Sequence, residues 1–96
     1  MRVYIDEDTT PDLAQFLDEH DVESTRTLAL HGTTNGELLK LLAGSFDVLI
    51  TRDRNLFFQQ NLAKHGLGLV VLRCRFNTLE GLRDLVPAIS AAITSV

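Results

Sequence analysis

The sequence predicts one α/β domain spanning residues 1–96, a three-layer sandwich around a four-stranded parallel sheet in the order 2-1-3-4. Three observations lead to this class. Short apolar runs alternate with amphipathic segments in the order β-α-β-α-β-α-β-α. The third and fourth runs are apolar without alternation, as expected for strands that helices cover on both faces. Right-handed crossovers between so few strands favour placing the first and third strands side by side.

Each expected element has a local signal of its own. Strands are expected at 3–5, 22–27, 48–51 and 69–74, where β-branched and other apolar residues cluster. The first helix is expected to start at Pro11 with Thr10 as its cap. The second is expected to be capped within 33–35 and to stop at Gly44, and a third is expected over about 55–64.

The last helix is expected to open at a capping box, Asn77 to Glu80, and to kink or restart at Pro87. Apolar residues at helical spacing predict which faces are buried. These are Leu13, Phe16 and Leu17; then Leu38, Leu39, Leu41 and Leu42; then Leu82, Leu85, Val86, Ile89 and Ile93.

Composition excludes several classes of protein. An apolar content of 45% argues against a disordered chain, and no apolar run approaches the roughly 20 residues of a membrane span. Acidic residues follow the first five positions, which is unlike a secretory leader. The single cysteine, Cys74, lies in an apolar run and is expected in the core of a protein in a reducing, cytoplasmic setting. The spacing of His20, His31 and His65 is not that of a zinc site.

Two carboxylates are expected to meet at one edge of the sheet. Asp6 follows the first strand and Asp53 follows the third, so both lie at the switch point where ligands bind in such folds. Helices enter from the same edge, which makes Glu37 the best third acid. Clustered carboxylates repel one another and favour a hard cation, Mg²⁺ or Mn²⁺. The alternative is that Asp6 and Asp53 only cap the helices that follow them.

Charge is unevenly distributed along this chain of net charge −4. Residues 1–25 carry eight acids and one base, whereas residues 26–96 carry eight bases and five acids. Four arginines are expected at the carboxylate edge, where they suit phosphate oxygens, and Gln59 is expected to face the cleft or a base edge. The arginines are Arg52, Arg54, Arg73 and Arg75. They could instead pair with Asp6, Asp8 or Asp53 and neutralise the cluster.

Three stretches, RVYIDED, GTTNGELLKLL and DVLITRDRNL, resemble the PIN-like nuclease superfamily, and more narrowly a small toxin-like branch related to VapC-type toxins. The resemblance covers residues 2 to about 74. It implies an endoribonuclease of toxin–antitoxin modules, with Mg²⁺ or Mn²⁺ held by acids, an RNA substrate, and room for an antitoxin-like partner or a homodimer. By position it implies that Asp6 and Asp53 are metal-binding acids and that Thr51 supports them.

The chain departs from the commoner pattern of that superfamily at two positions. Asn35 stands where an acid often opens the middle helix, and Asn55 stands where a second acid often follows Asp53. An amide brings no charge, so metal affinity should fall unless Glu7 and Asp8 compensate. These departures motivate an alternative, a PIN-like module that binds nucleic acid or a protein without cleavage.

A receiver-like signalling domain would also place acids after its first and third strands. That fold has a fifth strand ending in a lysine, and neither follows Cys74 here.

Overall fold

Four parallel strands form the centre of the computed structural model, which describes residues 1–25, 28, 32, 35–52, 54, 61, 64, 66–73 and 78–95. The strands are β1 (Arg2–Ile5), β2 (Asp21–Ser24), β3 (Val48–Thr51) and β4 (Gly68–Val71). They pair in parallel in the order β2-β1-β3-β4, with Val3 opposite both Val22 and Val48. The predicted parallel sheet and its 2-1-3-4 order are confirmed.

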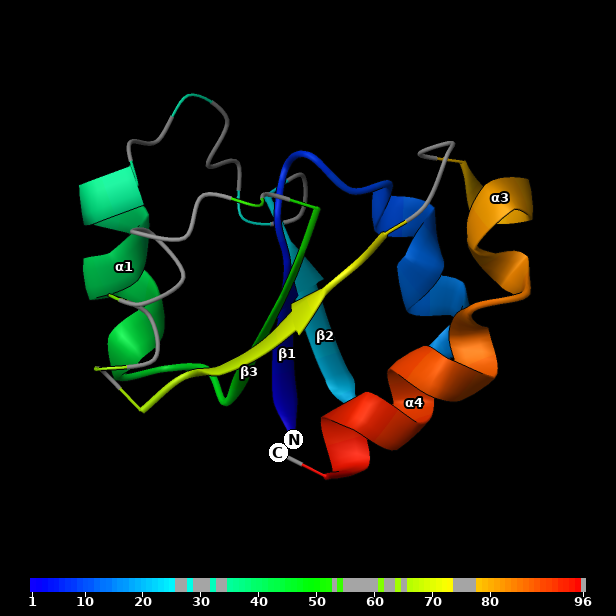
Figure 1. Ribbon diagram of the computed structural model, residues 1–96. Helices are drawn as coiled ribbons and strands as arrows, with labels where there is room; N and C mark the ends of the chain where they lie inside the picture. Colours follow the sequence, from blue (N-terminus) through cyan, green and yellow to red (C-terminus); the bar gives the residue numbers. More distant parts are fainter. Residues whose placement is uncertain are drawn as a thin grey trace.

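Helices cover both faces of this sheet (Figure 1). The α1 helix (Asn35–Ala43) lies on one face, and η1 (Pro11–Phe16), α3 (Leu79–Arg83) and α4 (Val86–Thr94) lie on the other. Because side chains alternate along a strand, Val3 and Ile5 join the core on the side of η1 and α4, and Tyr4 joins the core under α1. All four residues of β3 are buried, which explains why its sequence shows no alternation.

Local signals account for most of the helix ends. The Thr10 hydroxyl accepts a hydrogen bond from the Asp12 N–H at 3.4 Å, as expected for a cap, although the segment it opens is a 3₁₀ helix. The α1 helix ends at Ala43, directly before Gly44. Pro87 lies in the first turn of α4 and marks the expected restart of the last helix.

Other predicted details were wrong. Thr78, not Asn77, caps α3, and its hydroxyl accepts from the Gly81 N–H at 3.0 Å. Leu41 is 42% exposed, because Leu38 and Leu42 form the inner face of α1 one turn apart. The second strand ends at Ser24 rather than at residue 27, since the Leu28 N–H turns back to the Ser24 carbonyl at 3.0 Å.

Three predictions fall partly or wholly outside the described residues. These are the helix over 55–64, of which Asn61 and Lys64 are described and helical; the burial of Leu39; and the burial of Cys74. Within the part of the chain that is described, no helix is long and apolar enough to cross a membrane.

The inner face of α1 gives a test of the packing. We expect Leu42→Ala to lower the free energy of unfolding by about 2–5 kcal/mol, because it leaves a cavity under a fully buried side chain. Leu41→Ala, one residue away on the exposed side, should change it by less than about 0.5 kcal/mol. Urea unfolding of both variants measures the difference, and equal losses would contradict this orientation of α1.

Candidate functional site

The carboxyl ends of β1 and β3 bring together the residues with the clearest chemistry. From β1 the chain moves to β2 on one side, and from β3 it moves toward β4 on the other. The two central strands therefore form the switch point that the sequence predicts. Asp6 follows β1 directly, and its N–H donates to the Ile50 carbonyl at 2.9 Å, which extends the β1–β3 ladder by one residue.

The Asp6 carboxylate is held on both of its oxygens. Oδ1 accepts from the Glu7 N–H at 2.9 Å, and Oδ2 lies 3.0 Å from the hydroxyl of Thr51. Thr51 is the last residue of β3 and is fully buried, so its hydroxyl has a fixed place beneath the acid. The contact places the Thr51 hydroxyl beside Asp6, and its supporting role stays a prediction.

Asp8 reaches the same hydroxyl through a tight turn. The Thr9 N–H donates to the Asp6 carbonyl at 3.0 Å, which brings Asp8 back over the end of β3. Its Oδ2 then lies 3.1 Å from the Thr51 hydroxyl. Its Oδ1 accepts from the Thr9 hydroxyl at 2.9 Å and from the Arg52 N–H at 3.1 Å. Asp8 is therefore a central member of the cluster, whereas the sequence indicated it only as compensation.

One hydroxyl between two carboxylates sets an electrostatic constraint. Thr51 Oγ1 carries a single proton, so it donates to Asp6 or to Asp8 but not to both at once. If both acids are ionised, the second contact of about 3 Å joins two acceptors and is repulsive. The arrangement is satisfied when one carboxyl carries a proton or when a cation lies beside both.

The surroundings of Asp6 disfavour the charged form of its carboxyl. Burial raises the pKa of its carboxyl, and the negative charge of Asp8 raises it further. The hydrogen bonds from Thr51 and from the Glu7 N–H lower this pKa without cancelling the rise. No cationic side chain among the described residues is a cause of the shift.

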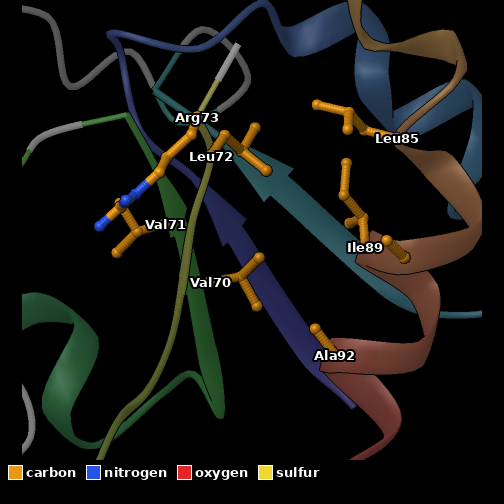
Figure 2. Close-up of a pocket in the computed structure, with 8 residues that line it drawn as sticks. Val70, Val71, Leu72, Arg73, Leu85, Ile89 and Ala92 are labelled. Atoms are coloured by element: carbon orange, nitrogen blue, oxygen red, sulfur yellow. The ribbon is translucent and has the colours of Figure 1, made fainter.

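Arg52 does not neutralise this pair in the way the sequence allowed. Its guanidinium Nη1 donates to the backbone carbonyl of Asp8 at 3.3 Å. Between two described residues, a salt bridge joins Arg2 to Asp21 at 3.2 Å, away from this edge. Arg54 and Arg73 are exposed, and Figure 2 shows Arg73 pointing away from α4, on the same side of β4 as Val71.

The structure gives less detail on the remaining predicted site residues. Glu37 is exposed in the first turn of α1, which starts at the same edge as the strand ends (Figure 1). Among the described residues, no group of three or more His, Cys, Asp or Glu could hold a metal, so the role of Glu37 as a third ligand stays a prediction. Glu7 is exposed, and Asn35 opens α1. The other predicted residues lie outside the described ranges, namely Asp53, Asn55, Gln59 and Arg75, as does the side chain of Asn35.

An apolar groove of about 330 Å³ lies between β4 and α4 (Figure 2). Val70 of β4 and Leu72, which follows β4, point into it opposite Leu85, Ile89 and Ala92. The described residues of its lining include no acid, and neither Asp6 nor Asp8 is among them.

We expect Asp6→Asn to raise the melting temperature at pH 7 without added metal. The amide keeps the acceptor for the Glu7 N–H, and its Nδ2 donates to Thr51, which then donates to Asp8. The pKa of Asp6 is raised in the folded state. Its ionisation therefore lowers the stability of the fold as the pH rises above the ordinary carboxyl pKa of about 4. The gain should therefore shrink as the pH falls toward 4.

Thermal unfolding between pH 4 and pH 8 measures this gain. Asp18→Asn, at an exposed acid in the turn before β2, is the control and should show little change. A melting temperature that Asp6→Asn leaves unchanged or lowers at pH 7 would contradict repulsion between the two carboxylates.

Comparisons with protein-family models, with curated proteins and with solved structures found no match to this chain. The functional interpretation therefore rests on the geometry of Asp6, Asp8 and Thr51.

Proposed function

We propose that the protein is a PIN-like endoribonuclease that depends on Mg²⁺ or Mn²⁺ and forms the toxin-like component of a toxin–antitoxin module. One observation carries the proposal. Two carboxylates, Asp6 and Asp8, converge on the single hydroxyl of Thr51 at the carboxyl end of the central strands. Such an excess of negative charge is costly without a counter-ion, and a hydrolase that uses a cation needs a site of this kind.

The donor set fits a hard divalent cation. Its members are carboxylate oxygens, and Mg²⁺ and Mn²⁺ prefer oxygen ligands. Asp6 and Asp8 would hold the ion, and Thr51 would keep the two carboxylates turned toward each other. A bound ion of this type polarises a phosphodiester and lowers the pKa of a coordinated water.

The proposal includes Asp53 as a third metal-binding acid, on the basis of the sequence. It follows Thr51 by two residues and is expected at the same edge, where Asn35, Asn55 and Glu37 would support it. Two described carboxylates are few for a metal-dependent nuclease. A third acid would strengthen the binding of the divalent cation and would neutralise more of its charge. The amides at 35 and 55 would make the affinity lower than that of an all-acid site.

RNA is the proposed substrate because positive charge is available beside the acids. Arg54 is exposed just after β3, and Arg73 is exposed two residues beyond β4. Both follow strands that end at the carboxylate edge, so their guanidinium groups would meet the phosphates of a strand bound there. Arg75 and Gln59 would extend this contact, and an antitoxin-like protein or a second copy of the chain would be the protein partner.

Cleavage of a mixed panel of RNAs with Mn²⁺ tests the proposal. Wild type should cleave, and the three variants Asp6→Ala, Asp8→Ala and Asp53→Ala should each lose activity by more than about a hundredfold, the usual loss when a group acting on the reacting atoms is removed. Asp18→Ala changes an exposed acid in the turn before β2, at the opposite edge of the sheet, and should stay within about twofold of wild type.

Variants as active as wild type would contradict the assignment of these acids. A wild type that cleaves no RNA would contradict the nuclease proposal. If that inactive protein binds RNA equally well with Mn²⁺ and with EDTA, the alternative of a non-catalytic binding module gains support.

A further inference from the structure

Arg52 connects the end of β3 to the turn that carries the acids. Its backbone N–H donates to Asp8 Oδ1 at 3.1 Å, and its guanidinium Nη1 donates to the Asp8 carbonyl at 3.3 Å. The residue therefore binds Asp8 from two sides, once at the carboxylate and once at the backbone. Its side chain is partly buried rather than extended into solvent.

The second of these bonds is the informative one. A guanidinium that serves only as a counter-ion would be expected on the carboxylate, where its attraction is strongest. Here the carboxylate accepts instead from uncharged donors, the hydroxyl of Thr9 and the N–H of Arg52, and it lies beside the Thr51 hydroxyl that it shares with Asp6. The negative charge of Asp8 stays available to a cation while the guanidinium holds the backbone.

The turn needs such a support. Between Ile5 and Pro11 the chain is neither strand nor helix, and the hydrogen bond from the Thr9 N–H to the Asp6 carbonyl closes it at 3.0 Å. Asp8 is anchored to β3 through Thr51 and Arg52. If the turn shifted by an ångström, the two carboxylates would no longer face the same point.

We propose that Arg52 is a positioning residue, whose guanidinium fixes the Asp6–Thr10 turn so that Asp6 and Asp8 face one cation, and that it does not hold substrate phosphate. The cation-binding part of this inference rests on the proposed function; the fixing of the turn does not. The exposed arginines, Arg54 and Arg73, would then contact the substrate phosphates.

Substitution of Arg52 by lysine distinguishes a positioning residue from a phosphate-binding residue. Arg52→Lys keeps the positive charge that attracts phosphate but replaces the planar fork of donors with a compact ammonium on a different stem. A phosphate-binding residue should tolerate this change in large part. A positioning residue should not, because its bond to the Asp8 carbonyl depends on the reach and direction of Nη1.

Three measurements on Arg52→Ala, Arg52→Lys and the control Arg54→Ala test the inference. They are calorimetric titration with Mn²⁺ alone, RNA binding in EDTA, and hydrogen exchange of the Thr9 amide. Both Arg52 variants should weaken Mn²⁺ binding by about tenfold, the usual cost of losing a residue that orients a metal ligand. Both should also speed exchange at Thr9 and leave RNA binding nearly unchanged, whereas Arg54→Ala should weaken only RNA binding.

Other results would overturn the inference. If Arg52→Lys matches wild type in Mn²⁺ affinity and in Thr9 exchange, while Arg52→Ala loses RNA binding, then Arg52 holds phosphate. If wild type binds no Mn²⁺, the proposed function fails, and exchange at Thr9 still decides whether Arg52 fixes the turn. Faster exchange in both Arg52 variants would support that role, and unchanged exchange would exclude it.

Discussion

The single proton of the Thr51 hydroxyl is the constraint on which the candidate site depends. Two carboxylates lie about 3 Å from that oxygen, and only one of them receives the proton at any moment. The other contact needs a proton or a cation of its own. A structural role alone would favour one acid at this position, since a second adds repulsion to a buried strand end. The cost of keeping both acids is the physical reason for regarding the cluster as functional.

The sheet order makes this cluster possible. The β1 and β3 strands are neighbours, so Asp6 and Thr51, which are 45 residues apart in sequence, come within hydrogen-bond distance. The fully buried β3 strand holds Thr51 from below, and the β1–β3 ladder continues through the Asp6 N–H. The β3 strand thus supplies Thr51, and Asp6 directly follows β1, while a short turn supplies Asp8.

The strands and their order were predictable from sequence because short continuous apolar runs that alternate with helical segments are typical of buried parallel strands. The predicted bounds of the third strand agree with the observed bounds of β3, Val48–Thr51. Asp6 was expected at the carboxyl edge of the sheet because it directly follows the first predicted strand. The central place of Asp8 in the cluster could not be predicted from sequence. Its position depends on a hydrogen bond within the Asp6–Thr10 turn and not on a periodic pattern of residues. The spacing Asp-x-Asp directly after a strand is the signal that would have drawn attention to it.

The role of Arg52 was hidden for a different reason. A long side chain with five donors reaches many partners, and sequence does not distinguish a carboxylate, a phosphate and a backbone carbonyl among them. The exposure of Leu41 shows the same limit for apolar residues, since four leucines in five positions of α1 cannot all face inward. Patterns predict elements well, but contacts made by turns and by flexible side chains depend on packing.

The central claim, that Asp6 and Asp8 hold a divalent cation above Thr51, is tested most directly by adding Mn²⁺ in substoichiometric amounts to the isotope-labelled protein. Paramagnetic broadening falls off steeply with distance from the ion. The amide signals of Glu7, Thr9, Thr51 and Arg52 should be the first described ones to broaden, and those of Asp21 and Asp47, at the opposite edge, should persist. Uniform broadening, or broadening that begins at Asp21 and Glu23, would contradict a cation site at this edge of the sheet.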